Sequence, residues 1–331
     1  FGSFRTVLNC IHMKIIPKVF LLILLVQFSC KPISKESSTE ETAPKYWASI
    51  ELDSLKKFNS FEVLGLSTDD RLVEISGMVP SVANTGLFWV HNDSGDKPQL
   101  FLVNTALEVQ FTVLFTEKVK HLDWEDITLS LKDGRTMITI ADIGDNRAVR
   151  NNVTLYQFEE PKILTGKESM RIDEVEVMNI TYKEGPRDAE ALAYDPIGGN
   201  LVIFSKRDEK IKVYLFEFSA GQKEVRSDFE VDLTALNPSS AYPNMVTAAD
   251  INSDGYVLLK NYEDVFLLAN ADGSSLEELL RAEVNFERVN YIPELQGEAL
   301  CWDRTDFSYY CTSEKQDDGI FSGVQPLFKY Q

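Results

Sequence analysis

The strongest constraint on the fold of this 331-residue chain is a short segment that occurs five times along it. In four copies a glutamate stands directly before an apolar run, and in the other copy an alanine takes its place. The copies are Glu74-Ile75-Ser76, Glu125-Asp126-Ile127, Glu190-Ala191-Leu192, Ala249-Asp250-Ile251 and Glu298-Ala299-Leu300. A strand-rich unit that repeats every 50 to 65 residues or so is typical of a β-propeller. Because the innermost strands of a propeller all start around one axis, we expect the four glutamates to lie close together.

Each repeat divides into short β-runs separated by turn residues, as a propeller blade requires. The first repeat has runs at Glu74–Pro80, Leu87–Asn92, Gln99–Asn104 and Val109–Phe115. The last repeat has only three runs, and an apolar run before the first repeat, Phe61–Leu66, can supply the fourth strand. Such pairing closes the ring and removes exposed sheet edges. We therefore predict an all-β propeller of five blades, each with four antiparallel strands.

Two other architectures compete with this prediction. A propeller of six blades needs one more repeat, which we do not find, and a two-sheet sandwich leaves the repeated glutamate unexplained. Turn sequences such as Asp133-Gly134 and Asp254-Gly255 fall between the runs, where hairpins need residues with positive φ, and so support the division into strands. The last run of the fourth repeat, Leu276–Glu287, is expected to be partly helical.

The first part of the chain predicts export rather than folded structure. Residues 1–12 precede the first methionine, Met13, and we interpret them as upstream sequence. Residues 13–30 have the basic start and the apolar Val19–Val26 run of a signal peptide, a run too short to cross a bilayer. Gln27-Phe28-Ser29-Cys30 resembles a bacterial lipobox, so Cys30 is the expected lipid anchor; the alternative is a simple secretion signal. The polar residues 31–45 predict a disordered tether, and residues 46–331 predict one propeller domain.

These features predict an exported bacterial lipoprotein, held at a membrane by its lipid and facing the periplasm or the cell surface, and monomeric. The formal net charge of −19 argues against a nucleic acid as partner, because such binding needs a basic surface. It favours cations as small partners.

Two cysteines fall in the predicted propeller, on two apolar runs joined by a short polar loop. If the runs form a hairpin, Cys301 and Cys311 lie roughly opposite each other, and an exported protein meets an oxidising compartment. A disulfide between them is one expectation. Two buried thiols that pack as small apolar side chains are the other.

The convergence of Glu74, Glu125, Glu190 and Glu298 predicts a bound cation, because four neighbouring carboxylates cannot all ionise without one. Oxygen ligands in this number suit Ca²⁺ better than Zn²⁺, which prefers nitrogen and sulfur. The alternative is that the glutamates pair with Arg187, Lys206 or Lys260, or accept N–H groups from a neighbouring blade.

The ends of the second strands share the face on which the first strands start, and they are polar. They read His91-Asn92-Asp93-Ser94-Gly95-Asp96, Asp142-Ile143-Gly144-Asp145-Asn146-Arg147, Ser205-Lys206-Arg207, Lys260-Asn261-Tyr262 and Ser313-Glu314-Lys315. From these and the run before the third repeat we predict substrate-binding residues at His91, Asn92, Asp93, Arg147, Arg187, Lys206, Lys260 and Asn261. Asp142 and Asp145 are the candidates to orient a catalytic water. The alternative is that the Asn and Asp residues cap tight turns.

Five segments resemble a family of uncharacterised exported bacterial proteins. They are His91 to Asp96, Asp123 to Ile127, Asp142 to Arg147, Arg187 to Leu192 and Gln296 to Leu300. More distantly, the layout resembles the calcium-activated nucleotidases (apyrases) and phytase-like propellers. The apyrase resemblance implies that Glu74, Ser76, Glu125, Glu190 and Glu298 hold one Ca²⁺ and that Arg147, Lys206 and Lys260 contact a phosphate.

Two functions follow from these patterns. The first is a Ca²⁺-dependent hydrolase of phosphate esters or related anionic substrates. The second is a non-enzymatic propeller with a structural ion, which binds a protein or a glycan. Basic side chains clustered beside the glutamates would favour the first function, and exposed aromatic side chains such as Tyr262 would favour the second.

Overall fold

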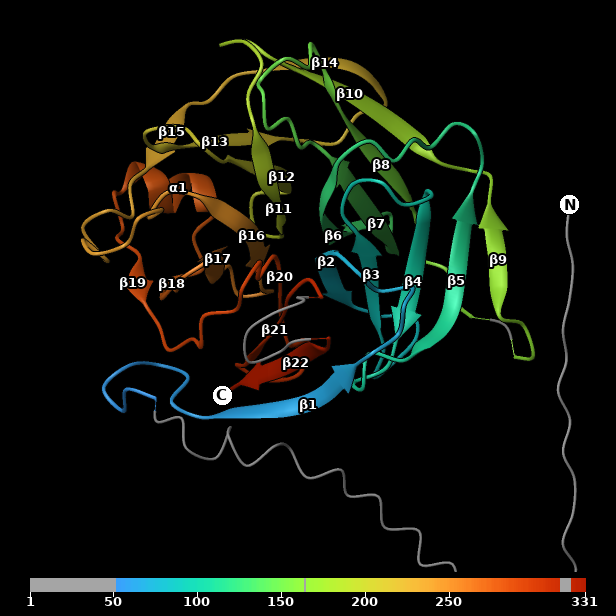
Figure 1. Ribbon diagram of the computed structural model, residues 1–331. Coiled ribbons are helices and arrows are strands. Elements are labelled where there is room, and N and C mark those ends of the chain that lie inside the picture. Colours follow the sequence, from blue (N-terminus) through green and yellow to red (C-terminus); the bar gives the residue numbers. More distant parts are fainter. Residues whose placement is uncertain (1–51, 164, 316–322) are drawn as a thin grey trace, which may run out of the picture. The chain divides into compact units, whose positions relative to one another are not determined.

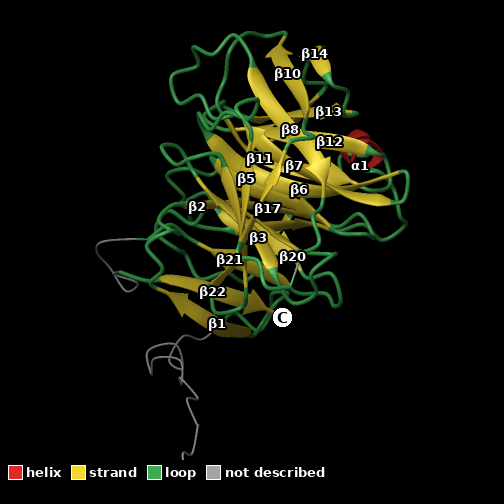
Figure 2. Ribbon diagram, turned by 90° about the vertical axis from the view of Figure 1, so that its right-hand side faces the viewer, coloured by secondary structure: helices red, strands yellow, loops and turns green. Residues whose placement is uncertain are grey.

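A computed structural model describes residues 52–163, 165–315 and 323–331 of the chain. These residues form five β-sheets around a common centre, with β2, β6, β11, β16 and β20 innermost (Figure 1). Strands make up nearly all the regular structure (Figure 2). The protein is a five-bladed β-propeller, as the repeat predicts.

Each blade is one sheet whose strands run outward from the centre. The first contains β2 (Ile75–Pro80), β3 (Phe88–Asn92), β4 (Gln99–Val103), β5 (Val109–Phe115) and β9 (Ser169–Ile172). The second contains β6 (Trp124–Lys132), β7 (Arg135–Asp142), β8 (Val153–Glu159), β10 (Glu176–Tyr182) and β14 (Gly221–Val225). The third contains β11 (Ala189–Asp195), β12 (Asn200–Ser205), β13 (Ile211–Phe216) and β15 (Phe229–Val231). The fourth contains β16 (Val246–Ile251), β17 (Val257–Asn261), β18 (Val265–Leu268) and β19 (Glu287–Arg288), and the fifth contains β20 (Ala299–Trp302), β21 (Tyr309–Thr312), β22 (Gln325–Tyr330) and β1 (Phe61–Ser67).

The ring closes where the sequence predicts. β1 pairs antiparallel with β22, so the first described strand completes the last blade. The innermost strands also contact one another in order, from β2 through β6, β11, β16 and β20 back to β2. A sixth blade has no place in this closed circuit, and a two-sheet sandwich does not form.

Two strands were not predicted, and both lengthen a blade at its outer edge. β9 follows β8 in the chain but pairs in parallel with β5 of the first blade. β14 follows β13 but pairs in parallel with β10 of the second blade. Each covers a sheet edge that would otherwise expose unpaired backbone groups. The connections that carry them link neighbouring blades.

The fourth blade contains helix α1 (Leu276–Arg281), in the run that the sequence predicts to be partly helical. Ser275 caps its N-terminus, and the Glu278 side chain in turn accepts from the Ser275 backbone N–H. This reciprocal capping satisfies N–H groups that a helix start otherwise leaves free. Leu276 and Leu279 are its buried residues.

A hydrophobic cluster fills each of the five interfaces between neighbouring blades. Trp89 and Trp124 pack between the first and second blades, and Trp302 packs between the fourth and fifth. All three indoles are fully buried. Burial of a side chain of this size contributes roughly 2–3 kcal/mol, so these interfaces fix the blades around the axis.

The expected disulfide does not form, and the expectation of two buried thiols is the correct one. Cys301 pairs across the hairpin with Tyr310, whereas Cys311 pairs with Leu300. Neighbouring residues of a strand point to opposite faces, so the two thiols lie in different clusters, Cys301 with the first blade and Cys311 with the fourth. Both are free and buried.

The predicted upstream segment, signal peptide, Cys30 anchor and tether lie outside the described residues. Within the described residues, no helix has the length and apolar character needed to cross a membrane.

Candidate metal centre at the hub of the propeller

A β-bulge at the start of the inner strand sets the geometry of the site. The register slips at one residue in each of the first four blades, leaving Ser76, Glu125, Glu190 and Thr247 in the bulge. In the fifth blade Ala299 pairs with Thr312 as Gly77 pairs with His91, so Glu298 holds the equivalent position. A bulge turns a side chain away from the regular alternation of a strand. The same local distortion therefore presents one side chain per blade to the axis.

This register corrects the repeat read from the sequence in two blades. The residue that matches Glu125 in the first blade is Ser76, not Glu74, and in the fourth blade it is Thr247, not Ala249. The two hydroxyls join neighbouring blades: Ser76 donates to the Glu125 carbonyl, and Thr247 donates to the Gly297 carbonyl over 3.1 Å. The Ser76 hydroxyl, expected to be a metal ligand, thus donates a hydrogen bond that links the first and second blades.

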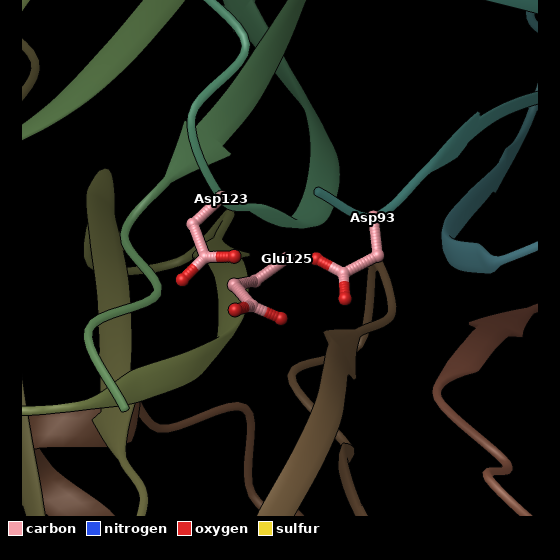
Figure 3. Close-up of side chains that lie close together, drawn as sticks. All are labelled: Asp93, Asp123 and Glu125. Carbon is pink, nitrogen blue, oxygen red and sulfur yellow. The ribbon is translucent and has the colours of Figure 1, made fainter. Parts of the chain in front are cut away.

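Carboxylates from three blades meet at the centre. Asp93, Asp123 and Glu125 each place an oxygen within 4.8 Å of the others, with Glu125 between the other two (Figure 3). Asp93, Glu298 and Glu314 form a second group with the same spacing, so Asp93 belongs to both. We call these five residues the acidic hub. Two oxygens bound to one Ca²⁺ lie at most about 5 Å apart, so each group has a spacing that one ion can bridge.

Two of the five hub carboxylates are buried, the other three are partly exposed, and the hydrogen bonding of the hub is incomplete. Glu125 is 4% exposed and Glu298 is 5% exposed. Within the described residues, Asp93 Oδ1 and Glu298 Oε2 are buried and have no hydrogen-bond partner. Buried polar atoms without a partner are rare in native proteins, and a bound ion is one explanation for them.

Burial and mutual repulsion shift the acidity of the hub. Burial, reinforced by the charge of Glu298, raises the pKa of Asp93 to about 7. The same two causes raise the pKa of Glu314 to about 9. Burial and the neighbouring Glu190 raise the pKa of Glu125 well above its usual range. A cation among these groups would lower all three pKa values, since it favours the charged forms.

Glu190, the ligand expected from the third blade, is neutralised by the protein itself. Its carboxylate forms a buried ion pair with Lys206, whose Nζ also lies 2.8 Å from the Tyr262 hydroxyl oxygen. That hydroxyl donates to Glu298 Oε1 over 3.1 Å. The chain Glu190–Lys206–Tyr262–Glu298 borders the acidic hub on the side of the third and fourth blades. The sequence offered a Glu–Lys206 ion pair as the alternative to a metal ligand, and the structure has that pair at Glu190.

The two carboxylates expected to be catalytic both accept hydrogen bonds from the protein. Asp142 accepts from the Arg150 guanidinium over 2.7 Å and from the Leu122 N–H over 3.2 Å. Asp145 accepts from the N–H groups of Val149 and Arg150 and so fixes the loop after β7. Neither carboxylate belongs to the acidic hub, and their role in orienting a water stays a prediction.

Most of the expected substrate-binding residues also hold the fold together. The exceptions are Asp93 and Lys206, which lie at or beside the acidic hub, and Arg147, which is exposed on the loop after β7. The others are His91, which is fully buried beside Trp124; Asn92 and Asn261, which bond backbone groups of nearby loops; Arg187, paired with Asp208; and Lys260, paired with Glu294. The turn-capping alternative therefore describes the two asparagines.

Glu74 lies at the edge of the site rather than within it. Its side chain is exposed, and its backbone carbonyl accepts from the Asp93 N–H over 2.7 Å. The Gln296 carbonyl accepts from Glu314 in the same way, and the Asp188 carbonyl accepts from Lys206. Glu74 is thus equivalent to residues two places before the bulge.

Sequence reasoning missed two hub residues, Asp123 and Glu314. Glu314 stands two residues after Thr312, just as Asp93 stands two residues after His91, and Thr312 and His91 hold the same register position, so the equivalence of the second strands could have identified it. Asp123 stands two residues before the bulged Glu125, the position that Glu74 and Asp188 hold in their blades, but this equivalence was hidden because a bulge is not visible in sequence. Burial raises the pKa of Asp123, and the nearby Arg150 opposes that rise.

A cavity of about 560 Å³ opens beside the acidic hub. It is lined by Tyr242, Met245, Tyr262 and Leu295, with Arg207 and Glu294 among its polar groups. Tyr262 connects it to the site, because this residue lines the cavity and its hydroxyl donates to Glu298. A space of this volume fits a small organic molecule.

Comparison with known proteins leaves the chain without an assigned family. No family model matches it, and no curated protein matches its sequence. Among solved structures, a luciferin-regenerating enzyme aligns with 10% identity and a TM-score of 0.45, over 82% of this chain and 94% of its own. A gluconolactonase from Xanthomonas campestris aligns with 11% identity and a TM-score of 0.40, over 81% and 91%. At these TM-scores neither likeness carries an argument about activity.

Proposed function

We propose that this protein binds a divalent cation, Ca²⁺ by the chemistry of its ligands, at the acidic hub, and that the ion serves the hydrolysis of a small ester. The observation that carries the proposal is the pair of buried carboxylate oxygens without a hydrogen-bond partner, Asp93 Oδ1 and Glu298 Oε2. They lie in one group with Glu314, and Asp93 is shared with Asp123 and Glu125. An all-carboxylate set of hard oxygen donors suits Ca²⁺.

A bound Ca²⁺ supplies a Lewis acid that polarises a carbonyl or phosphoryl oxygen and lowers the pKa of water. The chain supplies the rest of the site. Tyr262 holds one oxygen of Glu298 and leaves the other for the ion. Lys206 forms an ion pair with Glu190, whose charge still raises the pKa of Glu125. The adjacent cavity offers room for the organic part of a substrate.

The basic residues near the site indicate which class of ester it can bind. The apyrase resemblance favours a phosphate ester, which needs cationic side chains free to meet the phosphate. Lys260 is fully buried against Glu294, and Lys206 is committed to Glu190. Arg147 is exposed on a loop, and Arg207 lines the cavity. Arg207 is ion-paired with Asp188, but its side chain is 41% exposed, so these two arginines are the exposed basic groups that would meet an anionic substrate.

A second function, a binding propeller with a structural ion, is favoured by one specific observation. The carboxylates of the acidic hub come from the fifth, first and second blades, which are consecutive in the ring. An ion among them would tie together the region in which the ring closes, without any turnover. Export and attachment through Cys30 to a bacterial membrane remain part of the proposal on the strength of the sequence.

Calcium titration calorimetry on the purified propeller tests the site. We expect one Ca²⁺ per chain, with the affinity reduced at least tenfold in Glu125→Gln and in Glu298→Gln. Glu108→Gln, an exposed carboxylate of the first blade, is the matched control and should bind as the wild type does. Equal binding by all four proteins would place the ion elsewhere and remove the proposal.

A panel of chromogenic carboxylate and phosphate esters, assayed with Ca²⁺ and with chelator, separates the two functions. Turnover that needs Ca²⁺ and disappears in both hub variants supports hydrolysis. Tight Ca²⁺ binding without turnover on any ester assigns the ion a structural role.

A further inference from the structure

The five carboxylates of the acidic hub do not surround a single point. At a typical Ca–O distance of about 2.4 Å, two oxygens on opposite sides of one ion lie about 4.8 Å apart. The hub meets that limit in two groups of three: the first is Asp93, Asp123 and Glu125, and the second is Asp93, Glu298 and Glu314. The described residues form no group that contains all five. In this arrangement one ion can therefore contact the carboxylates of only one group.

The first group has the features of a cation position. Glu125 is 4% exposed, and no described residue donates a hydrogen bond to its carboxylate. Gly144 lies directly against Glu125 Oε1 and Asp123 Oδ2, and a Cβ at residue 144 would overlap both oxygens. The Glu125 carboxylate lies between those of Asp93 and Asp123 (Figure 3). A glycine thus makes room for carboxylate oxygens that the protein brings together but does not pair.

The second group is fixed by its neighbours in the same way. Glu298 is 5% exposed; its Oε1 accepts from the Tyr262 hydroxyl over 3.1 Å, and its buried Oε2 has no partner among the described residues. The Glu314 backbone N–H donates to the Gln296 carbonyl over 3.1 Å. Each group therefore contains one deeply buried glutamate with oxygens left for a ligand.

Asp93 belongs to both groups and is held in place by its backbone. Its N–H donates to the Glu74 carbonyl over 2.7 Å, which ties the end of β3 to the start of β2. One Asp93 carboxylate oxygen points toward Glu125, and the other is turned away from it (Figure 3). A carboxylate has two oxygens with lone pairs, so it can bind a different cation through each of them.

The charge of the hub favours two cations over one. Its five carboxylates carry five negative charges when ionised, and the basic side chains beside it are taken: Lys206 pairs with Glu190, and Arg150 pairs with Asp142. One divalent cation would leave three of the five charges without compensation, and two would leave one. Because uncompensated charge in a site withdrawn from water is costly, the second cation stabilises the ionised hub.

We propose that the acidic hub binds two divalent cations, one in each group, with Asp93 as the bridging ligand. This inference rests on the proposed binding of Ca²⁺ at the hub and adds a second ion to it. Pairs of metal ions about 4 Å apart hold the attacking and the leaving oxygen in many hydrolases of phosphate esters, so a pair here suits ester hydrolysis. The calorimetric titration counts the first ion to bind. Its charge repels the second, whose Kd we expect to be at least about tenfold higher.

Equilibrium dialysis against rising Ca²⁺, with the bound metal measured by atomic emission, counts the ions at saturation. The wild type should bind two per chain. Asp123→Asn and Glu314→Gln each remove a ligand from one group only, and each should bind one. Glu108→Gln, an exposed carboxylate outside both groups, is the matched control and should bind two. Because each hub variant must still bind one ion, loss of folding cannot be mistaken for the expected result.

Mn²⁺, which also prefers oxygen ligands, gives a spectroscopic test of the bridge. Two Mn²⁺ ions about 4 Å apart couple magnetically, so the bound wild type should lack the six-line electron paramagnetic resonance spectrum of an isolated ion. The six lines should return in Asp123→Asn and in Glu314→Gln. This measurement does not depend on any enzymatic activity.

Several results overturn the inference. A single ion in the saturated wild type does so, and leaves the proposed function intact because Ca²⁺ still binds the hub. Two ions in Asp123→Asn or in Glu314→Gln, or a six-line spectrum of the wild type with two bound Mn²⁺, have the same consequence. If no ion binds at all, the proposed function fails together with this inference.

Discussion

Two buried carboxylate sites in this propeller differ in how completely they are hydrogen-bonded. Glu160, just after β8, accepts from the Trp89 indole N–H over 2.9 Å, from the Ser81 hydroxyl over 2.6 Å and from the backbone N–H groups of Val82 and Ala83 over 3.1 Å. In the acidic hub Glu125 and Glu298 are similarly buried, yet the buried oxygens Asp93 Oδ1 and Glu298 Oε2 have no partner among the described residues. Both sites join blades. The hydrogen bonding of Glu160 is satisfied by the protein itself, whereas the acidic hub has oxygens left for a bound cation.

The difference shows how to separate structural carboxylates from binding ones. Removing a carboxylate from water is costly wherever it occurs, and donors repay that cost at Glu160. Asp126 at the axis follows the same rule, because it accepts N–H groups from Ile127, Leu192 and Ala249. Burial alone therefore does not identify a functional carboxylate. A buried carboxylate oxygen without a hydrogen-bond donor is the better indication of a binding site.

The largest effect that tests this comparison is expected at Glu160. Glu160→Ala leaves an indole, a hydroxyl and two backbone N–H groups without their acceptor, and we expect a loss on the order of 4 kcal/mol in the free energy of unfolding. Glu159→Ala is the matched control, because Glu159 forms only an exposed pair with Arg135 and its loss should cost less than about 1 kcal/mol. Urea unfolding measures both. Equal losses would show that the donors around Glu160 do not stabilise the fold.

The next effect is the stabilisation of the wild type by Ca²⁺. A ligand that binds only the folded state at one hundred times its Kd raises the free energy of unfolding by about 2.7 kcal/mol. The same increment should appear in Glu160→Ala, whose acidic hub is intact, and should vanish in Glu298→Gln. Urea unfolding with and without Ca²⁺ gives the three increments. If Ca²⁺ still stabilises Glu298→Gln, the ion does not bind at the acidic hub.

The strands and the blades could be predicted from the sequence, whereas the exact ligands could not. Alternating apolar runs and turn residues are local signals, and Phe61–Leu66 was recognisable as the closing strand because the last repeat lacked one. The bulge is set by backbone pairing, so Glu74 was aligned with Glu125 although Ser76 is its equivalent. The partners of Lys206 and Lys260 depend on which side chains meet in space, and so the sequence alone did not show that both were already paired.

A smaller effect, of opposite sign to that at Glu160, is expected when one hub charge is removed without metal. In Glu125→Gln a neutral side chain replaces a carboxylate whose charge is opposed by burial and by Glu190 and Asp93, so the metal-free variant should be more stable than the wild type at pH 8. At pH 4 the gain should disappear, because Glu125 is then protonated in the wild type as well. Chemical unfolding in chelator at the two pH values measures the difference. A loss of stability at pH 8 would mean that Glu125 has donors that the structure does not show.

The pH dependence of the metal-free wild type follows from the same shifts. Asp93 has an ordinary pKa of 3.8 when unfolded and about 7 when folded, and Glu314 changes from 4.5 to about 9. The folded state therefore binds more protons than the unfolded state between these values, and stability that is fully present below about pH 4 is lost as the pH rises to 7 and then 9. Ca²⁺ should flatten this decline, since it competes with protons for the same oxygens. Thermal melts from pH 4 to 9 in chelator test this, and stability that rises over this range would contradict the shifts.

The smallest effect is expected at Glu74, the glutamate that the sequence ranks equally with Glu125. Its side chain is exposed and it belongs to neither carboxylate group, so Glu74→Gln should change the Ca²⁺ affinity less than about threefold, as screened surface charges do. Glu314→Gln, on the same face but within the acidic hub, should reduce the affinity at least tenfold. Calorimetry on the two variants, which remove the same charge, isolates position as the cause. An equal loss of affinity in both variants would show that net negative charge holds the ion. The contrast between carboxylates with and without hydrogen-bond donors would then not explain the site.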